Sequence, residues 1–206
     1  MLSGCGGSRE ASTPQALKLR REDLVAVCRA LSGAAGQVAI EVADAKRAWR
    51  LVADGLPRMI PAALPPAIAA AAASAARITV PAPLQEAGAR TLTGPAAELA
   101  GLFRTYAVLS ARGWRLIAAA VAEIEHGPPA SALFARQNVA LYIESVYDGH
   151  FTLAQIGKKL RGGYSKLGGT AAFGSALVAA QVSALEAAYS ESSDRLHPHV
   201  GVRLGS

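Results

Sequence analysis

A glutamate and a histidine near the middle of the chain have the spacing of metal ligands on a helix. Glu123 and His126 stand three residues apart, the spacing by which ferritin-like carboxylate bundles place two ligands on one helical face. Such sites need a second pair, and Tyr147 stands both three residues before His150 and three after Glu144. His126 also falls at a predicted helix end, where the helix dipole favours a cation without any metal. We therefore predict no metal and no other cofactor, with Glu123 and His126 as the candidate ligands to examine.

Three further motifs of known chemistry do not occur in the sequence. There is no Cys-x-x-Cys-His for covalent haem, no glycine loop leading to Lys and Ser or Thr, and no Gly-x-Ser-x-Gly elbow. Cys28 falls on the apolar side of a predicted helix, where a thiol usually behaves as a small, inert hydrophobe. We therefore expect a protein that acts by binding. A metal- or ligand-binding bundle with enzymatic activity is an alternative. Polar side chains that converge inside the core would indicate such a bundle.

The basic residues of the chain are scattered except for one group. The net charge is +6 and the pI about 9.7, which suits a nucleic acid, an anionic membrane surface or an envelope polymer. The clustered residues are Lys158, Lys159, Arg161 and Lys166. No aromatic side chains alternate with them as in single-strand binders, so we do not expect a nucleic acid partner. Such a group is usually a solvated face, but each basic residue close to an anionic surface would add about 1 kcal/mol of attraction.

The first residues resemble the processing signal of bacterial lipoproteins. Residues 2–5, Leu-Ser-Gly-Cys, are similar to the lipobox, in which a small residue precedes the cysteine that is lipidated. The resemblance implies cleavage before Cys5, a diacylglycerol anchor on its thiol, and an extracytoplasmic protein whose partner is the membrane. Residues 6–14, rich in Gly, Ser and Thr, would complete a flexible tether over 1–14. A working signal also needs a basic segment and an apolar stretch of about 7–15 residues upstream, so a cytoplasmic protein with a cysteine near its start is the alternative.

The composition favours helices around a single core. Apolar residues make up 51% of the 206 residues and charged residues 17%, which is enough apolar material for one sizeable core. Alanine dominates the apolar set and has the highest intrinsic helix propensity. We therefore predict an all-α, up-and-down bundle over 15–190, with a flexible tail over 191–206.

Helical periodicity predicts where the long helices lie. Apolar or small residues recur at alternating steps of four and three over the first region, which predicts a helix at about 15–55 with a soft spot near Gly33. The same pattern predicts helices over 95–126 and 170–190. Residues 130–162 form either one helix or two nearly collinear ones, because Gly149 interrupts the run and a possible capping box follows it.

A proline-rich insertion separates the first two long helices. Residues 56–94 contain six prolines, so they cannot form one regular helix, and an alanine run predicts a short helix over 66–77. Residues 59–76 carry no charge, which raises the alternative of a membrane-active protein that inserts this segment into lipid. A spanning helix needs about 20 predominantly apolar residues, so a buried or capping hairpin is the favoured interpretation.

The two tryptophans of the chain lie in similar heptapeptides. Residues 47–53 read Arg-Ala-Trp-Arg-Leu-Val-Ala, and residues 112–118 read Arg-Gly-Trp-Arg-Leu-Ile-Ala. The similarity ends outside these windows, so convergence is favoured over duplication. Because Trp49 and Trp114 lie on the apolar sides of their helices, we predict that both are buried.

Overall fold

The computed structural model describes residues 14–52 and 59–163, and every regular element within them is a helix. In chain order these are α1 (Pro14–Val52), α2 (Leu64–Ala76), the 3-10 turn η1 (Ala82–Leu84), α3 (Glu86–Ala89), α4 (Gly94–His126) and α5 (Pro129–Gly163). The predicted all-α bundle is therefore confirmed for this part of the chain. The predicted helix at 170–190, the tail at 191–206 and nearly all of the predicted tether lie outside the described residues.

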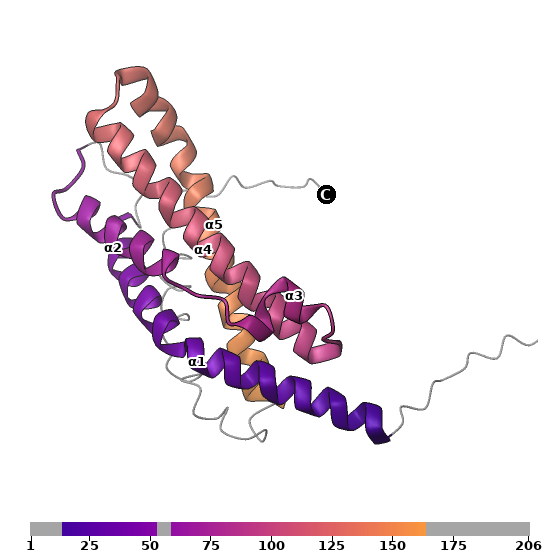
Figure 1. Ribbon diagram of the computed structural model, residues 1–206. Helices are drawn as coiled ribbons and strands as arrows, with labels where there is room; N and C mark the ends of the chain where they lie inside the picture. Colours follow the sequence, from indigo (N-terminus) through magenta and orange to yellow (C-terminus); the bar gives the residue numbers. More distant parts are fainter. Residues whose placement is uncertain (1–13, 53–58, 164–206) are drawn as a thin grey trace, which may run out of the picture.

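The bundle is arranged around α4. Helices α4 and α5 form a long antiparallel hairpin, while α1 and α2 pack together on the other side of α4. The end of the hairpin at which α4 meets α5 extends beyond α2 (Figure 1). One half of the core lies between α1 and the beginning of α4, and the other surrounds the two tryptophans.

The buried side of helix α1 follows the predicted pattern of apolar residues. The helix changes direction near its middle (Figure 1). Its buried side includes Leu31, Val38 and Ala45, all with no exposed surface. In the same central region, Ser32 donates a hydrogen bond back to the carbonyl of Cys28 over 3.0 Å, and Gly33 follows. A Ser-Gly pair with such a back-bond is a recognised cause of helix bending, in agreement with the predicted soft spot.

The apolar segment of the proline-rich insertion is packed inside the protein. Helix α2 carries Pro65 and Pro66 in its first turn, which tolerates proline because its N–H groups have no intrahelical partner. Its side chains Leu64, Ile68 and Ala71 are fully or almost fully buried, and α2 packs against both α1 and α4. The apolar surface that suggested membrane insertion is thus used in the core. The turn η1 and the short α3 that follow were not predicted.

Helix α1 also passes the length and composition test for a membrane span. An 18-residue window within Arg21–Val52 has a mean hydropathy of 1.3, and this is the one helix of the described residues that meets the criterion. One such helix is weak evidence, because core helices of soluble proteins pass the same test. Here the stretch contributes buried side chains to both halves of the core.

Helix α5 is one continuous helix, so the open choice over 130–162 is settled. The hydroxyl of Thr152 donates to the carbonyl of Gly149 over 2.7 Å within the helix and does not cap a new helix. Gly149 instead lies against α4, where an added Cβ would stand 3.1 Å from the Ser110 nitrogen. Gly113 of α4 approaches α5 in the same way, with an added Cβ only 2.5 Å from Val146 Cγ2. These two glycines allow the hairpin to pack closely.

Candidate functional site

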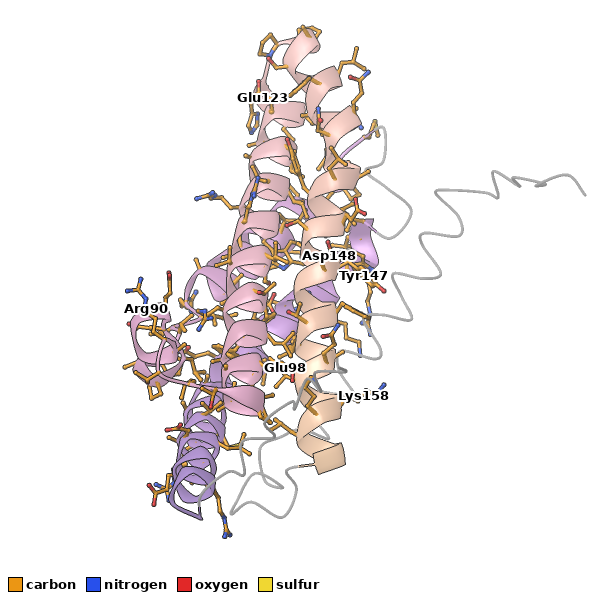
Figure 2. The ribbon with its side chains drawn as sticks, turned by 90° about the vertical axis from the view of Figure 1, so that its right-hand side faces the viewer. Arg90, Glu98, Glu123, Tyr147, Asp148 and Lys158 are labelled. Carbon is orange, nitrogen blue, oxygen red and sulfur yellow. The ribbon has the colours of Figure 1, made fainter. Side chains whose placement is uncertain are left out.

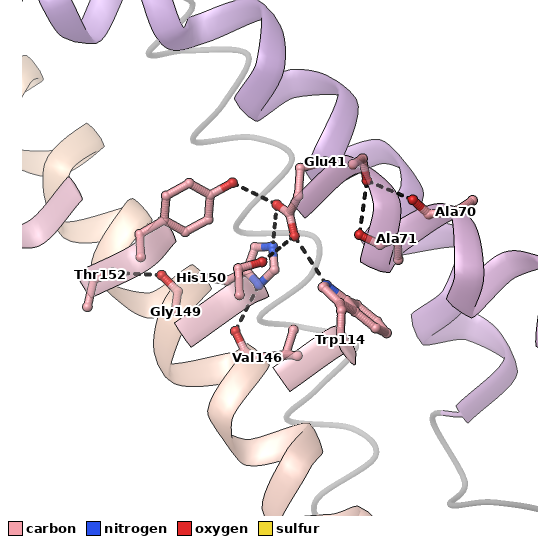
Figure 3. Close-up of polar contacts among 11 residues, drawn as sticks. Glu41, Ala70, Ala71, Trp114, Val146, Gly149, His150 and Thr152 are labelled. Carbon is pink, nitrogen blue, oxygen red and sulfur yellow. Dashed lines mark hydrogen bonds and ion pairs between the residues drawn. The ribbon is translucent and has the colours of Figure 1, made fainter. Parts of the chain in front are cut away.

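A carboxylate lies in the centre of the bundle and is completely buried. Glu41 of α1 has no exposed surface and accepts four hydrogen bonds from α4 and α5 (Figure 3). Its Oε2 accepts from the Tyr106 hydroxyl over 2.7 Å and faces Nε2 of His150 at 3.0 Å. Its Oε1 accepts from the Ser110 hydroxyl and from the Trp114 indole N–H, the latter over 3.2 Å. We call these five residues the Glu41 cluster.

The surroundings of His150 define its charge. Its Nδ1 lies 2.9 Å from the carbonyl oxygen of Val146, and its Nε2 lies 3.0 Å from the Glu41 carboxylate. Beside an ionised Glu41 both partners are acceptors, and these contacts fit a ring that carries a proton on each nitrogen. Glu41 and His150 therefore form a buried ion pair with no net charge, which is the condition under which a protein interior accommodates charges.

The electrostatics of the Glu41 cluster favour an ionised carboxylate. Burial by itself raises the pKa of Glu41, but attraction to His150 and the hydrogen bonds from His150, Ser110 and Tyr106 outweigh it, so the pKa lies below 4.5. The pKa of Tyr106 is raised well above 10, first by burial and then by the charge and hydrogen bond of Glu41. Tyr106 is therefore a permanent donor to the carboxylate at neutral pH.

The spacing of residues along α4 and α5 builds the cluster. Tyr106, Ser110 and Trp114 stand four residues apart, so one face of α4 presents all three donors to α1. The close approach at Gly113 and Gly149 brings α5 near enough for the neighbouring His150 to reach Glu41 past α4. The His150 ring also packs edge-on against Tyr106, with 5.9 Å between ring centroids.

The Glu41 cluster contains the residue types of a catalytic triad in the wrong arrangement. In a Ser-His-acid triad the histidine lies between the hydroxyl and the carboxylate, so that it can take the hydroxyl proton. Here the carboxylate of Glu41 lies between Ser110 and His150 and bonds to each. All three side chains have at most 1% of their surface exposed, and four donors occupy the carboxylate. This geometry joins three helices and presents no acceptor to a substrate.

The predicted metal ligands do not converge. Glu123 lies at the end of α4 (Figure 2), and His126 is 82% exposed and faces Glu125 at 4.0 Å. Within residues 21–52 and 59–160, no three His, Cys, Asp or Glu side chains gather as a metal site would require. Cys28 is buried, as predicted, and burial raises the pKa of its thiol, so the reactive thiolate is disfavoured.

The basic group is divided by the structure. Lys159 forms an ion pair with Glu98 of α4 over 2.8 Å, while Lys158 is exposed (Figure 2). The side chain of Arg161 and the whole of Lys166 lie outside the described residues, as does Cys5. The anionic-surface contact and the lipid anchor therefore remain predictions.

A second feature is a groove between α4 and α5 at the end of the hairpin. It has a volume of about 500 Å³. Helix α4 contributes Leu116, Ala119 and Glu123, and helix α5 contributes Ser131, Phe134 and Tyr142. Phe134 and its neighbour Leu133 are 64% and 58% exposed. Glu123 is the only charged residue in the lining.

Sequence reasoning missed the Glu41 cluster, although a signal was present. Glu41 stands three residues after Val38 and four before Ala45, which places a charge on the apolar side of α1. His150 occupies the corresponding position on α5, between Val146 and Leu153. A lone charge on each of two apolar helix faces is a sign of a buried pair, because unpaired charges are rarely buried.

Together these features define an all-α helical bundle with a saturated polar centre and a groove near one end. Searches against protein-family models, curated proteins and solved structures found no match to the chain.

Proposed function

We propose that this chain is an envelope-tethered helical-bundle protein that acts by binding, with the groove between α4 and α5 as its binding site. The observation that carries the proposal is the groove itself. Its volume of about 500 Å³ falls within the range of about 300–1,000 Å³ typical of small-molecule sites. Its lining is mainly apolar with a few polar groups, which is also the usual composition of such sites.

The Glu41 cluster is the convergence of polar side chains that would indicate an enzymatic bundle, but its geometry favours binding over catalysis. A general base or nucleophile must reach a substrate atom within about 2.6–3.2 Å. Glu41, Ser110 and His150 are buried and already bonded to one another, so reaching a substrate would require breaking the contacts that join the helices. The groove, by contrast, is lined by partly exposed side chains that can accept a ligand without unfolding the bundle.

The proposed location rests on the lipobox-like residues 2–5. A diacylated Cys5 would anchor the chain stably, because two acyl chains exceed the marginal affinity of one. The tether of residues 6–14, fully extended, would reach at most about 30 Å, so the bundle would stay close to the membrane. The exposed Lys158 would then be available to anionic headgroups or an envelope polymer.

A titration with the neutral fluorophore Nile red tests the groove. Ala119 lines the groove and is exposed, so Ala119→Trp would fill it with little disturbance of the core. Ala140→Trp is the matched control, because Ala140 is exposed on α5 but does not line the groove. We expect Nile red emission to rise with the wild-type chain and with Ala140→Trp, and not with Ala119→Trp. Equal binding by all three proteins would contradict the assignment of the site.

Mass spectrometry of the N-terminal peptide tests the tether. The full-length gene is expressed in its host and the membrane and soluble fractions are separated. We expect a diacylated peptide beginning at Cys5 in the membrane fraction, and a soluble product from Cys5→Ala. An unmodified Met1 peptide in the soluble fraction of the wild type would refute both the anchor and the extracytoplasmic location.

A further inference from the structure

We propose that the groove between α4 and α5 binds an amphiphilic organic cation, with the ammonium group at Glu123 and the apolar tail along Leu116, Phe134 and Tyr142. This inference rests on the proposed function and adds the class of ligand. The groove combines an apolar wall with a single carboxylate, which is the pattern complementary to an alkyl chain carrying one positive charge.

The carboxylate of Glu123 lacks a cation of its own. Within the described part of the chain, none of the ion pairs involves its side chain. The nearby His126 faces the preceding residue, Glu125, with 4.0 Å between Nε2 and Oε2. Glu123 is partly buried, so part of its hydration is already lost. A ligand ammonium would supply the missing counter-charge.

The position of Glu123 in α4 increases its need for a cation. It lies in the last turn of the helix, where the backbone carbonyls give the helix end a partial negative charge. A carboxylate is unfavourable at this position and a cation is favourable. The carboxylate also lies close to the backbone of Gly127, since a Cβ added there would stand 2.4 Å from Glu123 Oε1. The side chain is therefore folded over the negative end of the helix.

Aromatic rings complete the complementarity. Phe134 and Tyr142 line the same groove as Glu123, so an alkyl tail that extends from a cation at Glu123 would lie against their rings. Phe134 is 64% exposed, so an alkyl chain lying on it would remove apolar surface from water. An anionic amphiphile of the same length would meet the Glu123 carboxylate and the helix end with like charge.

The test is isothermal titration with three amphiphiles that share a ten-carbon tail, each kept below its critical micelle concentration. These are decyltrimethylammonium, decyl sulfate and the uncharged decyl maltoside. We expect decyltrimethylammonium to bind the full-length protein with one-to-one stoichiometry and more tightly than the other two. Glu123→Gln should weaken its binding about fivefold, as expected for a partly exposed ion pair, and remove the preference for the cation. The matched control, Glu125→Gln, should bind like the wild type, because Glu125 does not line the groove.

The outcomes separate this inference from the proposed function. Thermal unfolding of Glu123→Gln establishes that the variant is folded, and we expect a midpoint at or slightly above that of the wild type because the substitution removes a negative charge from the helix end. The inference is wrong if decyltrimethylammonium does not bind, if decyl sulfate binds as tightly, or if Glu123→Gln leaves the affinity unchanged. Should any of these occur while Ala119→Trp still abolishes Nile red binding, the groove remains a binding site and only the class of ligand is overturned.

Discussion

Glu41 of α1 and His150 of α5 form a buried ion pair with 3.0 Å between Oε2 and Nε2, although the backbones of their helices are well separated. No Cα atom of α1 lies within 8 Å of one in α5 among the described residues. The two long side chains bridge this distance beside α4, which contributes Tyr106, Ser110 and Trp114 to the same carboxylate. The Glu41 cluster is therefore a polar connection between helices that are not direct neighbours.

Removing the carboxylate should destabilise the fold severely. Glu41→Ala leaves the His150 charge buried without its partner and three further donors without an acceptor, so we expect a loss of about 3–5 kcal/mol in the free energy of unfolding. Urea denaturation followed by circular dichroism measures it. Glu22→Ala on the exposed face of α1 is the control and should change stability by less than about 0.5 kcal/mol. Equal midpoints for both variants would show that the cluster contributes nothing to the fold.

Acid should weaken the same connection. The folded-state pKa of Glu41 lies below its ordinary value of 4.5, so the unfolded chain takes up this proton at a higher pH than the folded chain does. The stabilisation is present in full above about pH 4.5 and is lost as pH falls through the folded-state pKa. We expect the urea midpoint of the wild type to fall below pH 4.5 more steeply than that of Glu41→Gln, which cannot titrate at this position. Parallel pH profiles would contradict the assignment.

The helices were predictable, and the Glu41 cluster was not, for related physical reasons. Burial of apolar side chains repeats with the helical period, so the ranges 15–55 and 95–126 agree closely with α1 and α4. Glu41 and His150 are exceptions to that repeat, and their pairing depends on how far apart α1 and α5 lie. That separation depends in part on how closely α5 packs against α4 at Gly113 and Gly149, and these contacts appear only when the helices are placed together.

Replacing glycines by alanine should have opposite effects on stability at the contact between α4 and α5 and at a position with open space. Gly113→Ala would place a Cβ 2.5 Å from Val146 Cγ2 and 3.0 Å from the Val146 nitrogen, so it should lower stability although alanine favours helix. Gly33→Ala meets no atom within 4 Å and should raise stability by about 0.5–1 kcal/mol. Thermal unfolding of both variants measures the contrast. A stabilised Gly113→Ala variant would contradict the close packing of α4 against α5.

The two tryptophans should contribute much of the stability of the half of the core that surrounds them. Trp49 and Trp114 are 2% and 0% exposed, as predicted, and pack edge to face with 6.4 Å between ring centroids. Replacing either by alanine should cost about 3–5 kcal/mol. Phe151→Ala is a control on an aromatic residue that is 46% exposed and should cost much less. Unchanged denaturation midpoints for both tryptophan variants would be incompatible with this core.

The groove illustrates a different limit of sequence reasoning. Glu123 was singled out as a candidate metal ligand because of its spacing from His126, yet the structure turns His126 toward Glu125 and places Glu123 in the lining of the groove. Phe134 lies within the helix predicted over 130–162 and is largely exposed. Which apolar residues remain uncovered depends on where neighbouring helices end, and this part of the hairpin extends beyond α2 (Figure 1).

Mapping a bound ligand by nuclear magnetic resonance distinguishes the groove from the buried polar centre. Isotope-labelled full-length protein is titrated with Nile red, and backbone amide shifts are followed residue by residue. Binding in the groove predicts that the largest shifts fall on residues 116–123 and 130–142, with no change at Glu41, Tyr106 or His150. Shifts centred on Glu41 and His150, with none along the groove, would contradict the assignment of the groove as the binding site. They would mean that ligands enter the polar centre of the bundle.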